Sequence, residues 1–533
     1  MIGNFPAHIG LNHSFAPAPL HGGQRGGSKT TIGAAALGLL ALFGTVGCSV
    51  LHVCEPGQPA QPSSEAPVPA NYPSGGGAKN SASLSWEEFF ADPVLTGLIR
   101  ASLDNNQELN ILLQEIAAAK AEVIGRKGAY LPFVTLGGGA GLEKPGRFTR
   151  DGAVEENLPI KPGKEFPEPL SELGLGAGFS WEVDIWRKLR NERDAAILRF
   201  LATKEGRGFM VTKLVSEMAE TYYELLALDN QLAFIKQTIQ IQQDALKAVQ
   251  QQKAAAKATE LAVRRFEAEV LKNQSHLYAI QQDIVVKENH LNFLAGRYPQ
   301  PIERNPALFV SKQFQAINAG TPVELLSKRP DIIQAELELA AAGLDVKSAR
   351  ARFYPSLDVM GALGLESYRA ASILTTPESV AYRAAADVVG PLINRSAIKA
   401  AYKGATASQV ASIYNYQQTV LAAYVEVLNE LSQIQNYTAS FELKSKQVQA
   451  LTDSVGIAGQ LFNSARADYT EVLFTQRDAL ESRMDLVELK QQQLSAYVKA
   501  YRALGGGYER SSVTGLEDLH VKTPVLAKQS KGN

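Results

Sequence analysis

The chain has 533 residues and a mass of 57.5 kDa, enough for two to four domains of ordinary size. Its 53 basic and 54 acidic side chains give a net charge of −1, which argues against a nucleic-acid-binding protein, because such proteins carry a basic excess. The only cysteines, Cys48 and Cys54, exclude a disulfide-stapled fold and a cysteine-rich zinc site. The histidines beyond the first 50 residues are too scattered to suggest a metal site.

The N-terminal segment has the layout of a secretory signal peptide, predicted over 1–47. Residues 31–47 form an apolar run that contains no acidic residue and follows Arg25 and Lys29. The run ends at Gly47-Cys48, which resembles the processing site of bacterial lipoproteins. This resemblance implies cleavage before Cys48 and acylation of its thiol and new amino group. An ordinary signal peptide and a short membrane anchor remain alternatives.

The next segment, 48–83, is rich in Pro, Gly and Ser, which is typical of a flexible tether. The body that follows is internally duplicated. When the sequence is shifted by 223 positions, ten identities fall between 115–143 and 338–366. We therefore predict two repeats, 84–305 and 322–510, joined by a linker at 306–321. The C-terminal tail is 511–533.

Each repeat is predicted to contain, in order, a short helix, a strand, a loop, a strand, a very long helix and a return helix. The long helices carry an apolar residue at every seventh position, which predicts a left-handed coiled-coil seam. In the first repeat these residues are Val211, Met218, Leu225, Leu232, Ile239 and Leu246. A periplasmic coiled-coil scaffold without a pore would show the same pattern.

The strands favour a membrane protein. From Leu173 to Ile185 the odd positions are apolar and the even positions are small or acidic. A tilted transmembrane strand needs about 9–11 residues of this kind, whereas a soluble half-buried sheet is the alternative. The second repeat shows a similar strand near 357–366, and 133–142 and 382–392 are weaker versions. Because open strand edges cannot lie in lipid, several copies of the chain must pool their strands into one closed barrel.

Seven short stretches now carry a family resemblance. In chain order they are 86–93, 105–106, 130–132, 180–186, 328–332, 353–357 and 503–508. Together they resemble the TolC-type outer membrane factors, and among these the lipoprotein (NodT-type) branch that serves RND efflux pumps. The resemblance covers about residues 84 to 510.

The resemblance implies a mainly α fold with a membrane β-barrel. Three chains would form a twelve-strand barrel that continues into a twelve-helix periplasmic tunnel. The implied function is a passive exit duct of a tripartite RND-type efflux pump in the outer membrane of a Gram-negative bacterium. Its partners would be a periplasmic adaptor, an inner-membrane pump and outer membrane lipid. A duct for type I protein secretion is the alternative within the same fold.

No enzyme, cofactor or metal site is expected. The glycine-rich runs 137–141 and 505–507 are not phosphate loops, since the first lies within a predicted strand and the second follows a helix. The sequence Arg329-Pro330-Asp331 is interpreted as a helix start, because proline and an acidic residue suit the first turn.

In this family the tips of the helical hairpins close the tunnel and contact the adaptor. The matching tips of this chain are expected near 253–269 and 463–474. Both lack the glycine that is usual at the turn. The candidate contact residues are Lys257, Thr259, Glu260, Arg466, Asp468 and Tyr469.

Many members of the family carry a gate aspartate shortly after the second tip. This chain has Phe474 at that position, with Glu471 before it and Asp478 after it. If Glu471 points inward, threefold symmetry creates a ring of carboxylates that favours cations, and Phe474 adds a hydrophobic collar. The alternative is that Glu471 is a solvated helix residue and Phe474 packs in the coiled-coil seam.

Overall fold

The computed structural model describes residues 62–63, 67–73, 80–160, 162–256, 258–391, 395–464 and 466–508, which belong to one unit, Gln58–Asn533. The predicted signal peptide, Cys48 and the tail from 511 onward lie outside the described residues. Among the helices of the described part, none combines the length and apolarity needed to cross a membrane.

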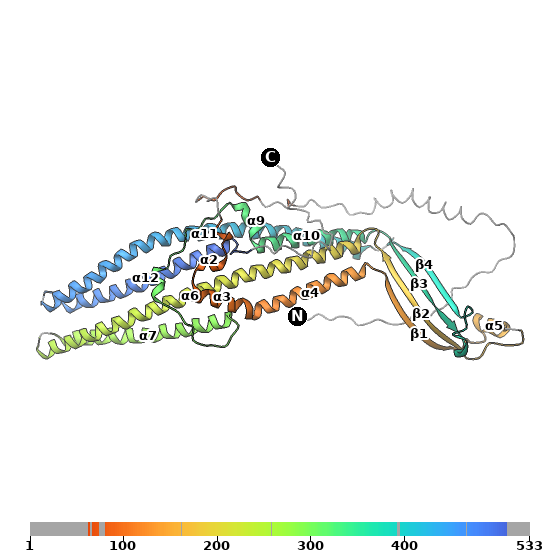
Figure 1. Cartoon of the computed structure of the whole chain (residues 1–533), viewed down its shortest axis with the longest axis horizontal. Coiled ribbons are helices and arrows are strands. Elements are labelled where there is room, and N and C mark those ends of the chain that lie inside the picture. Colours follow the sequence, from red (N-terminus) through yellow and green to blue (C-terminus); the bar gives the residue numbers. More distant parts are fainter. Residues whose placement is uncertain are drawn as a thin grey trace. The chain divides into compact units, whose positions relative to one another are not determined.

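The first repeat contains the predicted order of elements (Figure 1). After η1 (Ser81–Ser83), they are α2 (Trp86–Phe90), α3 (Pro93–Asn105), α4 (Gln107–Ala129), β1 (Phe133–Glu143), α5 (Arg150–Asn157), β2 (Leu170–Val183), α6 (Lys188–Ala254) and α7 (Glu260–Leu294). The short helix α5 was not predicted. It lies in the loop between the two strands, where a Thr149 cap starts it without any apolar periodicity.

The second repeat shows the same order. After α8 (Ala307–Ser311), which lies in the predicted linker, its elements are η2 (Pro322–Glu324), α9 (Leu325–Lys328), α10 (Pro330–Ala351), β3 (Ser356–Ser367), η3 (Ala370–Ser372), β4 (Val380–Val389), α11 (Ser396–Asn463) and α12 (Tyr469–Ala503). The helix start predicted at Pro330 is confirmed.

The four strands form one antiparallel sheet in the order β1-β2-β3-β4. The central pair β2–β3 joins the two repeats, with Leu175 opposite Leu365. Close packing there requires glycine, because a Cβ on Gly176 would lie 2.8 Å from the carbonyl oxygen of Leu363. Apolar side chains on the outer strands are exposed, including Leu136 at 82% and Val388 at 71%.

The helices continue the order of the strands. Helix α4 packs on α6, α6 on α10 and α10 on α11, while α6–α7 and α11–α12 form two long hairpins. Figure 1 shows both hairpin tips at the end of this unit opposite the strands. The predicted seam is confirmed, since Met218 and Leu225 of α6 are fully buried.

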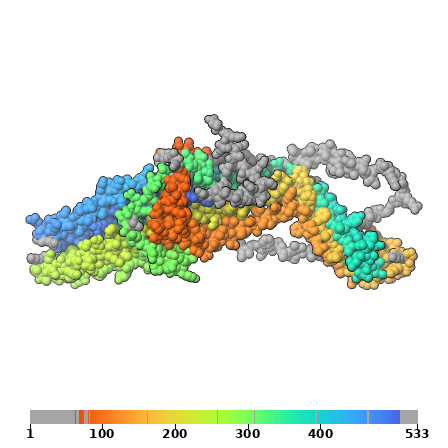
Figure 2. All heavy atoms as spheres, in the orientation of Figure 1, coloured from red at the N-terminus to blue at the C-terminus, as the bar shows by residue number. Residues whose placement is uncertain are grey.

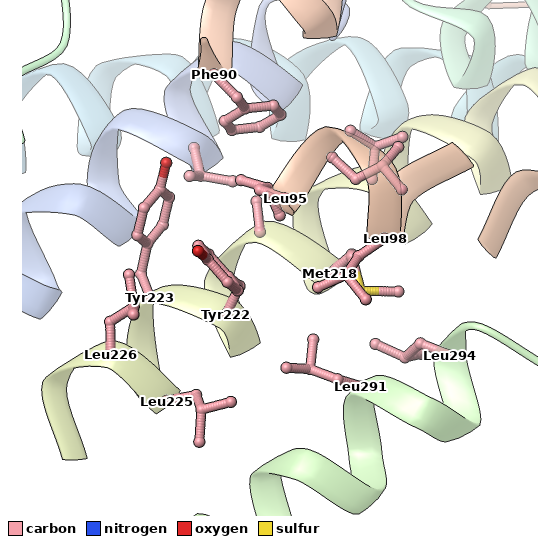
Figure 3. Close-up of a cluster of buried hydrophobic side chains, with 14 of the residues drawn as sticks. Phe90, Leu95, Leu98, Met218, Tyr222, Tyr223, Leu225, Leu226, Leu291 and Leu294 are labelled. Atoms are coloured by element: carbon pink, nitrogen blue, oxygen red, sulfur yellow. The ribbon is translucent and has the colours of Figure 1, made fainter. Parts of the chain in front are cut away.

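The largest core lies where short segments cross the long helices. Phe90 of α2 and Leu95 of α3 pack against Tyr222 and Tyr223 of α6, and Leu291 closes the cluster from α7 (Figure 3). Figure 2 shows the orange segment of α2–α3 and the green linker before α9 crossing the bundle between the tips and the strands. These crossings bind the two hairpins together near the ends of α7 and α12 that lie away from the tips.

The prediction of a flexible tether is wrong for the described pieces of 48–83. Tyr72 is only 3% exposed and stacks on Tyr424 of α11, with ring centroids 5.6 Å apart. The backbone N–H of Ser81 donates to the carbonyl of Asn318 at 2.9 Å. The described pieces of the tether are therefore anchored on α11 and on the linker before the second repeat.

Candidate functional site at the hairpin tips

The first tip is a short turn between Ala254 of α6 and Glu260 of α7. Within it Ala256 has φ of 58°, the left-handed conformation for which glycine is preferred. An alanine of this chain thus adopts the left-handed conformation at the first tip without a glycine. Thr259 caps α7, because its hydroxyl accepts the backbone N–H of Ala262 at 3.2 Å.

Charged side chains brace the first tip. Lys253 at the end of α6 pairs with Glu260 at the start of α7. Arg264 then bonds both Glu260 and Glu267, each at 2.9 Å. The hydrogen bond from Lys253 is the main cause that lowers the pKa of the Glu260 carboxyl below its ordinary value of 4.5. Glu260 is thus held ionised across the turn.

The two tips share one small apolar core. It consists of the buried side chains Val249, Ala262, Val263 and Phe266 of the first hairpin, against which Phe462, Tyr469 and Leu473 of the second hairpin pack. Tyr469 is half-buried in this contact. Hydrophobic contact therefore holds the predicted tips side by side.

The second tip is less firmly built. Asp468 stands at the cap position of α12, but its side chain accepts no hydrogen bond from the helix backbone; its carboxylate accepts the Thr470 hydroxyl at 3.3 Å. The backbone N–H of Arg466 donates to the carbonyl of Leu461 at 2.8 Å. Both Arg466 and Asp468 are exposed.

The three gate candidates lie on one stripe of α12. Glu471, Phe474 and Asp478 are spaced by three and then four residues, which places them on the same face of a helix. The buried residues Val472, Gln476, Ala479 and Leu480 follow the opposite face. Phe474 is 49% exposed, so it does not pack in the seam of its own hairpin. Glu471 is exposed as well.

Sequence reasoning missed Arg477, which joins this stripe. Its guanidinium lies 5.0 Å from the centroid of the Phe474 ring and donates to Asp478 at 3.1 Å. The i, i+3 spacing of an aromatic and an arginine was a visible signal. The arrangement leaves Glu471 as the carboxylate of the stripe that Arg477 does not neutralise. Lys257, the remaining tip candidate, lies outside the described residues.

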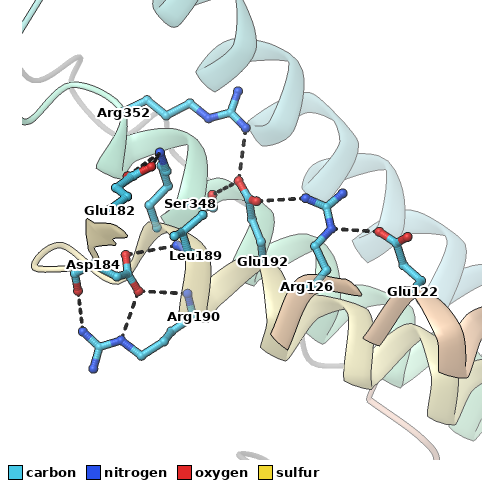
Figure 4. Close-up of polar contacts among 10 residues, drawn as sticks. Glu122, Arg126, Glu182, Asp184, Leu189, Arg190, Glu192, Ser348 and Arg352 are labelled. Atoms are coloured by element: carbon cyan, nitrogen blue, oxygen red, sulfur yellow. Dashed lines mark hydrogen bonds and ion pairs between the residues drawn. The ribbon is translucent and has the colours of Figure 1, made fainter. Parts of the chain in front are cut away.

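At the other end, polar contacts fix the helices where they meet the strands (Figure 4). Asp184, which is 5% exposed, accepts the backbone N–H groups of Leu189 and Arg190 and so starts α6. Glu192 of α6 bonds Arg126 of α4 and Arg352 after α10. These contacts orient the helices relative to the sheet. In the described part of the chain, no group of three or more His, Cys, Asp or Glu could hold a metal ion.

The family model of outer membrane efflux proteins matches residues 98–297 and 321–506. The chain belongs to this family. Its members are efflux channel proteins, and the chain is accordingly an outer membrane channel of an efflux system.

Curated relatives match more than four fifths of the chain. The pyoverdine export outer membrane protein OpmQ of Pseudomonas putida is 27% identical over 458 residues, 86% of this chain and 95% of its own. The cation efflux system protein CusC of Escherichia coli is 25% identical over 81% of this chain and 90% of its own. The probable outer membrane lipoprotein SilC of Salmonella typhimurium is 24% identical over 83% of this chain and 93% of its own.

Solved structures show the same fold. The MtrE outer membrane channel of Neisseria gonorrhoeae in its open state is 22% identical, with a TM-score of 0.74 over 85% of this chain and 98% of its own. A membrane protein from Pseudomonas aeruginosa is 23% identical, with a TM-score of 0.74 over 85% of this chain and 99% of its own. The predicted fold class, a mainly helical chain with two β-hairpins and long coiled-coil helices, is confirmed.

Proposed function

We propose that three copies of the chain form a passive exit duct for small molecules, the outer membrane component of a tripartite RND-type efflux pump. The observation that carries this proposal is the sheet itself. It has four strands, β1 and β4 form its edges, and both edge strands expose apolar side chains. Unpaired backbone groups are not tolerated in lipid. Three copies would join β4 of one chain to β1 of the next and close a twelve-strand barrel.

The proposal is tested by the mass of the detergent-extracted protein, measured by light scattering with correction for bound detergent and lipid. A trimer is expected. A monomer or dimer would contradict the proposal, because it supplies too few strands for a barrel. A trimer that conducts no ions in a planar bilayer would leave only a lipid-anchored coiled-coil scaffold.

Transport through the duct is powered by its partners. The family consists of efflux channel proteins, so the chain is proposed to catalyse no reaction and to need no cofactor. OpmQ and CusC have nearly the same identity to this chain, 27% and 25%, but their names give different cargoes, pyoverdine and cations. Sequence identity to these channels thus does not identify the exported compound. We propose that the inner-membrane pump selects it.

The hairpin tips are the proposed contact with the periplasmic adaptor. Thr259 and Glu260 are engaged within the first tip by the cap and by Lys253. Arg466 and Asp468 are exposed on the second tip, which makes them available to a partner of either charge. Cross-linking from position 466 to the adaptor should exceed cross-linking from position 260. Equal cross-linking would contradict this order.

Glu471 and Phe474 are the proposed gate residues. In a threefold channel the stripe on α12 would supply one ring of Glu471 carboxylates and one collar of Phe474 rings, with Asp478 tied to Arg477. Replacing Glu471 with Gln should reduce cation selectivity of the reconstituted pore. Reversal potentials equal to those of the parent would exclude the ring.

Cys48 is the proposed lipid attachment site, in a segment outside the described residues. The described tether is anchored on α11 at Tyr72, and about 24 residues separate this anchor from Cys48, which can span roughly 80 Å when extended. Mass spectrometry of the membrane-extracted protein should show acyl chains on an N-terminal Cys48. A Cys48→Ser variant that keeps the same added mass would contradict the assignment.

A further inference from the structure

Charge is strongly segregated where the helices meet the strands. The four segments 119–131, 182–200, 344–355 and 395–407 contain fourteen basic and six acidic side chains, although the whole chain has a net charge of −1. Each segment adjoins the helix-side end of a strand. The loops at the other strand ends, 144–169 and 368–379, carry six basic and six acidic side chains. The excess is therefore confined to one end of the sheet.

The acidic side chains in these segments are already neutralised. All six take part in ion pairs with arginines or lysines of the same segments. Five exposed lysines form no ion pair with any described residue: Lys120, Lys127, Lys347, Lys399 and Lys403. They come from α4, α10 and α11. In the single chain these lysine side chains are exposed, and no described residue supplies a counter-charge.

Aromatic side chains mark the same level of the molecule. Trp186 and Tyr354 stack with ring centroids 4.6 Å apart, and the Trp186 indole donates to the carbonyl of Pro355 at 2.8 Å. The Trp181 indole donates to the carbonyl of Tyr130 at 3.1 Å. Tryptophan and tyrosine with one apolar and one hydrogen-bonded side are typical of the boundary between lipid tails and headgroups.

We infer that the five lysines, here called the lysine belt, form a docking surface for anionic phospholipid headgroups at the helix-side face of the outer membrane. This inference rests on the proposed function, since it requires the strands to lie in lipid. Long lysine side chains can reach from a helix to the headgroup level. A phosphatidylglycerol headgroup supplies the negative charge that the belt lacks, and attraction between basic clusters and anionic lipid is strong at short range.

The test uses the full-length protein in nanodiscs that contain equal amounts of phosphatidylglycerol and phosphatidylcholine. Native mass spectrometry counts the lipids that stay bound. The belt variant changes Lys127, Lys399 and Lys403 to Gln. The matched control changes three exposed lysines far from the belt, Lys213, Lys236 and Lys446, to Gln, so that both variants lose the same charge.

The parent and the control should retain phosphatidylglycerol in preference to phosphatidylcholine. The belt variant should lose about threefold or more of this preference, because three of the five unpaired charges are gone. Equal preference in the two variants would overturn the inference. Displacement of phosphatidylglycerol by inorganic phosphate at constant ionic strength would also overturn it, since the belt would then be a general anion site.

Trimer mass and pore conductance of the same samples separate this inference from the proposed function. If the parent forms no trimer and no pore, the proposed function fails. If trimer and pore are normal but lipid preference is absent, the lysine belt alone fails.

Discussion

The two hairpin tips arise from equivalent positions of a duplicated chain, yet they are built differently. The first tip has a side-chain cap at Thr259, an ion-pair network around Glu260 and four fully or nearly fully buried apolar side chains of its own. The second tip has an Asp468 that caps no backbone N–H, and it exposes Phe474. The first tip is thus braced by side-chain contacts, whereas the second presents side chains outward.

Phe266→Ala should have the largest effect on stability. Phe266 is 1% exposed in the shared tip core, and deleting a buried phenyl ring costs about 3–5 kcal/mol. Hydrogen exchange should accelerate in 249–266 and also in 462–473, because Phe462, Tyr469 and Leu473 pack on this core. Faster exchange in the first tip alone would show that the second tip does not depend on the first.

Thr259→Ala should have the next largest effect. Loss of the cap on α7 removes the bond to the Ala262 N–H and should cost about 1 kcal/mol of local stability. The matched substitution in the second tip, Asp468→Ala, removes no bond to the helix backbone and should change exchange in α12 less. Equal effects of the two substitutions would contradict the conclusion that only the first tip is stabilised by a side-chain cap.

The Glu260 carboxyl should make the first tip sensitive to acid. Its pKa in the folded chain lies below the ordinary value of 4.5, so its stabilising contribution is full above that value and is lost as pH falls toward the lowered pKa. The protection factors of the first-tip amides, which correct exchange rates for the intrinsic pH dependence of amide exchange, should therefore fall below about pH 4.5, by less than they fall on loss of the Thr259 cap. Glu260→Gln should flatten this pH profile, whereas Glu471→Gln should leave it unchanged; a profile that keeps its slope in Glu260→Gln would contradict the assignment.

Phe474→Ala should have the smallest effect on stability, within about 0.5 kcal/mol, because half of the ring is exposed. Its effect should appear in function instead, as a higher conductance of the reconstituted pore. Phe474→Leu, which keeps an apolar side chain, is the matched control and should restore most of the parental conductance. Stability loss comparable to that of Phe266→Ala would mean that Phe474 packs in an interface.

The sequence by itself determined the elements and their order. The seven-residue spacing of Met218 and Leu225 predicted the long buried seam, and the alternation from Leu173 to Ile185 predicted β2. Both signals are periodic and local, because the pitch of a helix or a strand decides which residues share a face. The positions of the tips, by contrast, followed from the resemblance to the outer membrane factors. The gate candidates Glu471, Phe474 and Asp478 also followed from that resemblance, and their spacing along one helix places them on a common face.

Only the tertiary structure decided which elements meet. The pairing of β2 with β3 joins residues almost 200 positions apart, and Arg329 becomes buried by bonding Glu426 and the carbonyl of Ala503. In the same way, the stacking of Tyr72 on Tyr424 places part of the Pro/Gly/Ser-rich segment on α11. The contact of the Arg477 guanidinium with the Phe474 ring was likewise visible only in the structure. Periodicity shows that a face is apolar but not which surface will cover it. That choice depends on contacts between segments that are far apart in the sequence. These contacts form, and stabilise the chain, only once it has folded.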